Sequence, residues 1–415
     1  MNLLSQFFII MIVLTLGIQL WLANRHIHHV KSRREQVPDE FEGQIPLDAH
    51  QKAADYTVAR TRFGRIEAVI GSVLLLVWTL GGGLEWLDQY WRAMEWGPVT
   101  TGIAFMITVM VIMSIIDLPA SYYRTFVIES RFGFNKTTIT TFITDLFKGM
   151  LLTLIIGVPL LWAVLSIMQG AGELWWLYVW IVWFGFSLLM MWAYPAFIAP
   201  LFNKFSPLED SDLKAGIETL LKQCGFKSNG IFVMDGSRRS AHGNAYFSGI
   251  GNKKQIVFFD TLIKQLEADE IEAVLAHELG HFRMHHIRKR LISMGVISLL
   301  SLAVLGWLIE QQWFYNGLGV SEASNYMALM LFMLMAPLFG FFMTPLMSML
   351  SRKHEFEADA YASKQRHPGL LIKALVKMYE ENASTLTPDP IYSSFYDSHP
   401  PAPVRIEHLK KQFNT

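Results

Sequence analysis

The sequence predicts a mainly α-helical integral membrane protein: a bundle of seven membrane helices that carries a small polar domain of mixed α and β structure. Three observations predict this. Of 415 residues, 52% are hydrophobic and 17% are charged, whereas about a quarter of a soluble protein is charged. Seven apolar runs approach or exceed the roughly 20 residues that a helix needs to cross a bilayer. Two long polar stretches, 200–290 and 351–415, provide the remaining domain.

The first apolar run could be mistaken for a signal peptide, but no basic residue precedes it and no small-residue cleavage site follows it. It continues into the basic segment 24–34, which is typical of a stop-transfer flank, so we expect a retained span. The seven predicted spans are residues 3–22, 66–87, 101–118, 150–168, 175–197, 291–309 and 327–350.

The charges of the loops predict the orientation. Basic residues follow spans one and three, whereas the connections after spans two, four and six are acidic, with Arg92 as their only basic residue. Because basic loops stay in the cytoplasm, we expect the N-terminus outside and both polar stretches inside. The basic residues are Arg25, Lys31, Arg33, Arg34, Arg124, Arg131 and Lys136, and the acidic ones are Glu95, Glu173, Glu310 and Glu322.

Composition also excludes some functions. The formal net charge is zero, so the chain has no basic field for nucleic acid, and its expected surroundings are a lipid bilayer. A single cysteine, Cys224, excludes an internal disulfide and a cysteine zinc cluster.

Residues 269–282 predict a helix with a metal site. Acidic residues occupy its first turn, where the helix dipole favours them. His277 and His281 are four residues apart, so both imidazoles can face one metal ion. Glu278 points beside that ion and can take a proton from a water molecule as a general base. Two unrelated surface histidines are the alternative interpretation of this motif.

A catalytic zinc site needs a third protein ligand and one open position. Just after span seven, Glu355 and Asp359 again lie four residues apart. Glu355 can bind the metal while Asp359 accepts a hydrogen bond from a ligand imidazole. We therefore expect one zinc ion per chain, bound by His277, His281 and Glu355. Four residues compete with Glu355 on weaker grounds: His285, His286, His354 and Glu357.

Several further motifs resemble one family, the type I CAAX prenyl proteases, which are polytopic zinc endopeptidases. The similarity runs in unbroken order over about residues 60–410. Besides the two metal motifs it rests on ESRFGFNK at 129–136, APLFNKF at 199–205, MDGSRRSAHGNAYF at 234–247, FDTL at 259–262 and SHPP at 398–401.

The resemblance implies a ring of seven membrane helices around a large water-filled chamber, with the zinc site at its cytoplasmic end. It also implies a role for each matching residue. His277, His281 and Glu355 match the zinc ligands, Glu278 matches the general base, and Asp359 matches an acid sometimes assigned as proton donor. Residues Asn244, Ala245 and Tyr246 match an edge strand that pairs with the substrate, and His399 and Arg405 match residues that stabilise the oxyanion.

The residues themselves agree with parts of this. Segments 245–250 and 255–260 flank Gly251-Asn252, which predicts a β-hairpin. An exposed strand of that hairpin could bind an extended peptide by strand addition. His399 and Arg405 could donate hydrogen bonds to the developing oxyanion, although their sequence pattern alone predicts ordinary surface residues.

We therefore expect a zinc endopeptidase that cleaves peptides or proteins at the membrane, including prenylated CAAX tails. Its expected parts are spans one to five (1–199), a catalytic domain (200–290), spans six and seven (291–350) and a C-terminal segment with the third ligand (351–415). A membrane quality-control protease is the alternative enzyme. A transporter or scaffold with structural zinc is a third hypothesis, although such a site would not need Glu278.

The expected location is a bacterial inner membrane, with the endoplasmic reticulum as the alternative. The loop between spans six and seven is short, and the sequence ends KKQFNT, without a retention signal for the endoplasmic reticulum.

Overall fold

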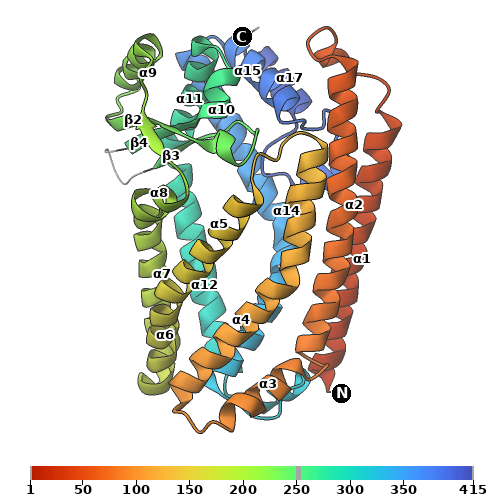
Figure 1. Ribbon diagram of the computed structural model, residues 1–415, viewed down its shortest axis with the longest axis vertical. Helices are drawn as coiled ribbons and strands as arrows, with labels where there is room; N and C mark the ends of the chain where they lie inside the picture. Colours follow the sequence, from red (N-terminus) through yellow and green to blue (C-terminus); the bar gives the residue numbers. More distant parts are fainter. Residues whose placement is uncertain (1, 249–253, 414–415) are drawn as a thin grey trace.

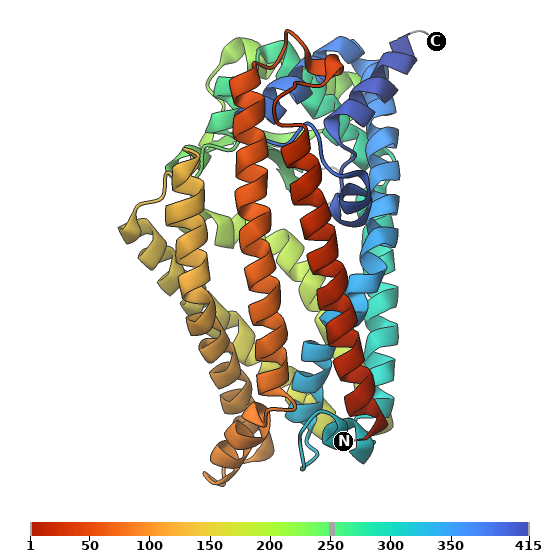
Figure 2. The same cartoon turned by 90° about the vertical axis from the view of Figure 1, so that its right-hand side faces the viewer.

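The computed structural model describes residues 2–248 and 254–413. Long helices run along the molecule, and a compact head of shorter helices and one sheet sits at the end that holds the C-terminus (Figure 1). The N-terminus lies at the opposite end (Figure 2). The two chain ends are therefore separated by the length of the helices, as an odd number of spans requires.

Continuous helices form the membrane part. Three of them extend through short π-helical segments, which are η2 after α4, η3 between α5 and α6, and η5 between α7 and α8. The helices of this part are α1 (Leu3–Ser32), α2 (Leu47–Trp78), α3 (Gly83–Arg92), α4 (Pro98–Tyr123), η2 (Arg124–Glu129), α5 (Ile139–Leu152), η3 (Thr153–Gly157), α6 (Val158–Gly170), η4 (Gly172–Leu174), α7 (Trp175–Ala193), η5 (Tyr194–Ile198), α8 (Ala199–Phe202), α12 (His286–Leu308), α13 (Gln312–Gly317) and α14 (Asn325–Gln365).

Within the described residues, six helices are long and apolar enough to cross a membrane, and α2 with α3 makes a seventh as a bent pair. The two parts of that pair meet at 47°. The span predicted at 66–87 is therefore present as two helices with a bend between them. The chain turns after Trp78, where Gly82 adopts a left-handed φ of 80° that suits only a residue without a side chain.

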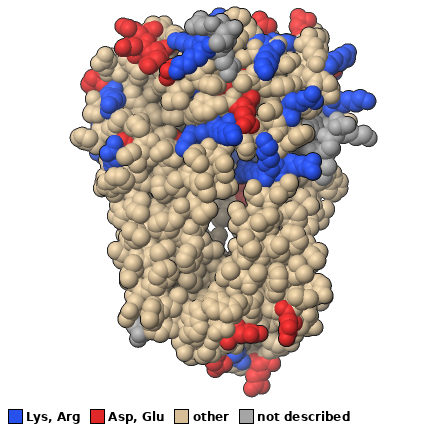
Figure 3. Space-filling view, turned by 180° about the vertical axis from the view of Figure 1, so that it is seen from behind, with Lys and Arg blue, Asp and Glu red and all other residues tan. Residues whose placement is uncertain are grey.

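The membrane helices form an open bundle. In three of them, only 11% of the most apolar window is buried within the protein. Their main buried cluster includes Phe105, Tyr315 and Met327, and it belongs to the end opposite the head. In Figure 3 the surface without charged side chains is hollowed midway along the molecule. This agrees with the expected ring of helices around a chamber.

The head has its own core around a four-stranded sheet. Strand order is β1-β2-β4-β3, with β2 and β4 parallel and the outer pairs antiparallel. Apolar residues of the sheet and helices meet in one cluster that includes Phe258 and Leu279. The head elements are η1 (Asp39–Phe41), β1 (Phe205–Pro207), α9 (Ser211–Gln223), β2 (Ser228–Met234), η6 (Gly236–Arg238), β3 (Ala245–Ser248), β4 (Lys254–Phe259), α10 (Asp260–Gln265), α11 (Ala268–Arg283), α15 (Pro368–Glu381), α16 (Pro390–Tyr396) and α17 (Ala402–Phe413).

Head and membrane part share helices. The proposed boundaries at 199/200, 290/291 and 350/351 fall inside α8, α12 and α14 respectively. Helix α14 runs for 41 residues from the far end of the membrane part into the head. The catalytic segment after span seven is therefore a direct extension of a membrane helix.

Candidate metal centre

Helix α11 presents the first two candidate ligands. It begins with a capping box, in which Glu267 and Glu270 satisfy each other's backbone N–H groups. Its apolar side packs into the head core through Leu275 and Leu279, and this leaves His277 and His281 on the side that faces α14. The prediction of a helix over 269–282 is confirmed.

Helix α14 brings the third candidate ligand against α11. The two helices approach closely at Gly280, where an added Cβ would lie 2.9 Å from Ala358 Cα. A larger residue at this position would hold the helices apart. Gly280 therefore lets Glu355, one turn before Ala358, reach both histidines.

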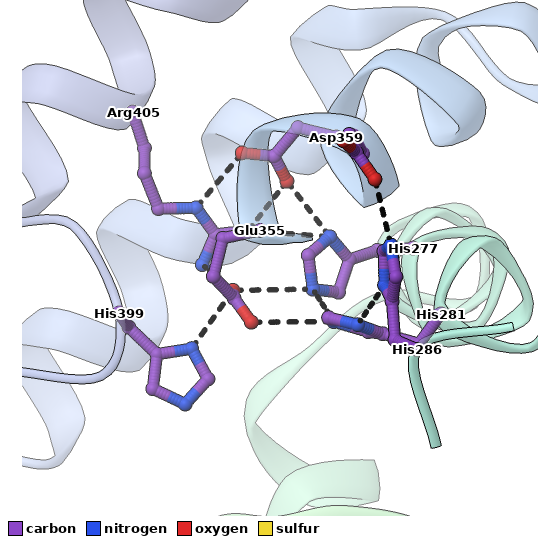
Figure 4. A network of polar contacts seen from close by, with 8 residues as sticks. His277, His281, His286, Glu355, Asp359, His399 and Arg405 are labelled. Carbon is purple, nitrogen blue, oxygen red and sulfur yellow. Dashed lines mark hydrogen bonds and ion pairs between the residues drawn. The ribbon is translucent and has the colours of Figure 1, made fainter. Parts of the chain in front are cut away.

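The three side chains converge on one point (Figure 4). Glu355 Oε1 lies 3.2 Å from His281 Nε2, and Glu355 Oε2 lies 3.5 Å from His277 Nε2. One donor atom from each of the three residues lies within 4.8 Å of the others. No other such group of three occurs among residues 2–248 and 254–413.

These residues fit a zinc ion. Two imidazoles and one carboxylate are the donor set of a catalytic zinc site. Glu355 Oε2 is buried and makes no hydrogen bond of good geometry within the described part of the chain, although His399 Nδ1 lies 2.8 Å from it, so this oxygen can still bind a cation. Burial alone would lower the pKa of His277, but hydrogen bonds to Asp359 and Glu355 raise it to about 9. The same two carboxylates would stabilise a zinc ion that takes the place of the proton at this imidazole.

A buried ion pair sets the orientation of His277. Asp359, which is fully buried, lies 2.7 Å from His277 Nδ1 through Oδ1. Arg405 Nη2 and Nε donate to the two oxygens of Asp359, at 2.5 and 2.9 Å. A ligand imidazole whose second nitrogen is held by a carboxylate presents the first nitrogen in a defined direction.

Comparisons with known proteins find matches along most of the chain. Residues 26–204 match the model of the CAAX prenyl protease N-terminal region with five membrane helices. Residues 207–412 match peptidase family M48. The chain is 36% identical to CAAX prenyl protease 1 homolog of Arabidopsis thaliana, covering 90% of each protein, and 34% identical to CAAX prenyl protease 1 of Saccharomyces cerevisiae, covering 91% of this chain and 89% of the relative.

The fold is similar as well. The crystal structure of S. mikatae Ste24p superposes with a TM-score of 0.91 at 32% identity, over 99% of both chains.

The chain belongs to the CAAX prenyl proteases of peptidase family M48. It is a multi-pass membrane metalloendopeptidase, and its family implies zinc. Membership of this family supports an enzyme and argues against the hypothesis of a transporter or scaffold with structural zinc.

Within this protease, the competing ligand candidates lie just outside the metal group. His286 is buried, and its Nδ1 is 3.0 Å from His281 Nδ1. Its Nε2 is 2.9 Å from Glu357, and its ring stacks on His354. His286 therefore orients His281 much as Asp359 orients His277. The sequence did not predict this role, although His286 follows His281 by only five residues. His285 adopts a left-handed φ of 57° at the break between α11 and α12.

The other predicted catalytic residues lie around the ligands. Glu278 is half-buried and makes no hydrogen bond or ion pair with any described residue. The His399 side chain is 65% exposed, with Nδ1 2.8 Å from Glu355 Oε2. Arg405 is only 7% exposed, so the expectation of an ordinary surface residue was wrong for it. Arg405 is buried because its charge is balanced by Asp359.

The predicted hairpin is confirmed in its strands. β3 pairs with β4 from Ala245 opposite Phe258 to Ser248 opposite Gln255, and β3 is the edge strand of the sheet. Asn244 precedes β3, and its carbonyl accepts a hydrogen bond from Phe259 N–H. The proposed turn at 251–252 lies outside the described residues.

The segment before β3 is anchored to a membrane helix end by the 129–136 motif. Ala241 N–H donates to the carbonyl of Phe134, and Lys136 N–H donates to that of Arg239. Arg239 also forms a two-fold ion pair with Asp145 on α5. The 129–136 motif and Arg239 thus fix the position of the edge strand relative to the membrane part.

Proposed function

We propose that this protein is a zinc-dependent endopeptidase that removes C-terminal peptides from prenylated CAAX substrates at the membrane surface. The observation that carries the proposal is the convergence of His277, His281 and Glu355 beside a carboxylate, Glu278, that nothing else in the described chain engages. A structural zinc site would have no use for such a base. Two relatives that match over 90% and 89% of their own length are named CAAX prenyl protease 1 homolog and CAAX prenyl protease 1.

Each residue has a proposed task. His277, His281 and Glu355 bind one zinc ion per chain, which would polarise the scissile carbonyl and acidify a water molecule. Glu278 accepts the proton from the attacking water. His399 donates to the oxygen on which negative charge develops.

Arg405 can share that task only through Nη1, which lies 3.6 Å from Glu355 Oε2, because its other nitrogens bind Asp359. Both oxygens of Asp359 are likewise occupied by His277 and Arg405. This supports the role of Asp359 in orienting His277 over a role as proton donor.

The substrate backbone is proposed to pair with Asn244, Ala245 and Tyr246. β3 has one edge that no strand covers among the described residues, so an extended peptide can add to it. The prenyl group would then extend into the apolar chamber below the head.

The head is proposed to face the cytoplasm and the N-terminus the outside. Figure 3 shows Lys and Arg gathered at the head end, with acidic residues prominent at the other end, and basic residues remain cytoplasmic. We propose the bacterial inner membrane as the location, on the basis of the short connection after α12. A C-terminal tag that an impermeant reagent labels on intact cells would reverse this orientation.

The test is cleavage by purified protein in lipid nanodiscs. A farnesylated CAAX peptide and its unprenylated counterpart are incubated with wild type, and products are mapped by mass spectrometry. We expect release of the C-terminal tripeptide, faster with the farnesyl group, and complete loss with a chelator. Equal cleavage of both peptides at scattered sites would instead support a quality-control protease.

A further inference from the structure

A cavity of about 690 Å³ lies between the membrane helices and the head segment that leads to His399. Its walls come from α1, α2, η2 and the segment around α16, and Figure 2 shows α1, α2 and the α4–η2 helix side by side on that face. Asp397 lines the cavity, and His399, two residues later, contacts Glu355. Two residues of chain span at most about 7 Å, so the cavity ends within about that distance of the His399 backbone.

The polar wall of this cavity carries unbalanced positive charge. Arg60, Arg65 and Arg124 line it, against the acids Glu67 and Asp397. Arg124 is paired with Glu67. Arg65 donates to Asn24, and Arg60 lies over the ring of Tyr56 at 5.3 Å. Neither Arg60 nor Arg65 has a carboxylate within ion-pair distance in the part of the chain that the structure describes. Arg60 is exposed and Arg65 half-buried at the mouth of the cavity, and guanidinium groups without a carboxylate partner favour an anionic ligand.

The cavity also lies at one particular end of the edge strand. Asn382 lines the cavity, and its Oδ1 accepts a hydrogen bond from Gly243 N–H, two residues before β3. The cavity is therefore at the N-terminal end of β3. A peptide that pairs with β3 in the antiparallel direction, which is slightly more stable per residue, has its C-terminus pointing toward this end.

The second wall of the cavity is apolar and includes Leu20, Ala23, Phe63 and Ile128. Aliphatic side chains near the end of a peptide could pack there while its terminal carboxylate meets the arginines. A lipid phosphate would satisfy the arginines equally well, but it would not explain why the cavity opens next to His399 and the start of β3.

We propose that this cavity binds the free C-terminal carboxylate of the peptide substrate, with Arg60 and Arg65 as the anion-binding residues. This inference rests on the proposed function and deepens it. The carboxylate subsite and the edge strand together fix how far the scissile bond lies from the chain end. Release of a fragment of defined length then follows from geometry, without any recognition of sequence.

The test compares one farnesylated peptide as a free acid and as a C-terminal amide, in nanodiscs of phosphatidylcholine. A charge-assisted hydrogen bond typically accounts for about 10- to 100-fold in affinity, so we expect wild type to prefer the acid by about that factor in KM. In Arg60→Gln and Arg65→Gln the acid-to-amide ratio should fall toward one. Arg62→Gln is the matched control, because Arg62 is exposed on the same helix and does not line the cavity; its ratio should equal that of wild type.

Binding of the same two peptides to zinc-loaded Glu278→Gln protein separates this inference from the proposed function. A preference for the acid in binding without any cleavage by wild type would keep the subsite and refute the protease. Cleavage of acid and amide with equal KM would refute the subsite and keep the protease. If cleavage responds to added phosphatidylglycerol only when Arg60 is present, while the acid and amide peptides behave alike, the cavity takes lipid phosphate and the proposal is overturned.

Discussion

The head and the membrane part of this protein differ in which side chains they bury and which they expose. The head buries charge: Asp359 is 0% exposed and Arg405 7%, and both are held in one network with His277. The membrane part exposes apolar side chains: Leu300, for example, is 61% exposed, which costs nothing where lipid replaces water. A buried charged network tolerates little movement because an unpaired buried charge is costly. The catalytic residues therefore lie in the tightly packed head, whereas the space for the substrate lies in the loosely packed membrane part.

The largest expected effect comes from removing a ligand in the head. In His277→Ala both zinc and peptide cleavage should be lost, because only two of the three ligands remain. Metal content by atomic absorption and turnover are measured on one preparation. His28→Ala is the control at a histidine far from the network in sequence, and it should keep both. Stoichiometric zinc in an active His277→Ala protein would disprove the ligand assignment.

The next effect separates chemistry from metal binding. Glu278→Gln keeps the shape of the side chain and removes the base, so cleavage should fall by about 10²- to 10⁴-fold, the usual contribution of a general base. Zinc content and peptide affinity should stay at the wild-type level. Turnover within about tenfold of wild type, below that usual contribution, would remove Glu278 from the mechanism.

A smaller loss is expected at the orienting carboxylate. Asp359→Asn keeps a hydrogen-bond acceptor for His277 but leaves Arg405 buried without its counter-charge, and zinc affinity should fall by about 10- to 100-fold. The measurement is competition with a chromophoric chelator. Glu357→Gln, which touches the network only through His286, is the matched control and should lose less. If the two variants bind zinc equally, the buried pair has no special part in holding the ligand.

The smallest expected effect is a change in stability at two glycines of the helices, one tightly packed and one loosely packed. In Gly280→Ala the new Cβ meets Ala358 at 2.9 Å, and such overpacking costs about 1–3 kcal/mol, which exceeds the gain of up to about 1 kcal/mol in helix propensity. Gly340→Ala, in the membrane part of α14, meets no atom within 4 Å and should be neutral or stabilising. Thermal unfolding in nanodiscs with zinc present checks both. Equal unfolding midpoints for the two variants would show that α11 and α14 need not touch.

Much of the fold could be predicted because local pattern is enough for it. Because bilayer thickness dictates the length of an apolar run, each span could be recognised from its own residues. The helix of the HELGH motif follows from its caps and periodicity. The break after Trp78 was missed because an apolar pattern continues through the glycines at 81–83 into α3. The hairpin strands were predictable from two flanking segments, whereas the closeness of β3 to the 129–136 motif was not, since more than a hundred residues separate them.

The sequence by itself determined the chemistry at short range: two histidines and a base on one helical turn, and two acids on another. Only the tertiary structure decided how these turns meet. It placed Glu355 beside both imidazoles and buried Arg405 against Asp359. It also brought His286 into contact with His281. Arg60 and Arg65 line a cavity and have no acidic partner there. The physical reason is that spacing along a helix fixes which side chains share a face, while the partner of a buried charge comes from whatever element packs against that face.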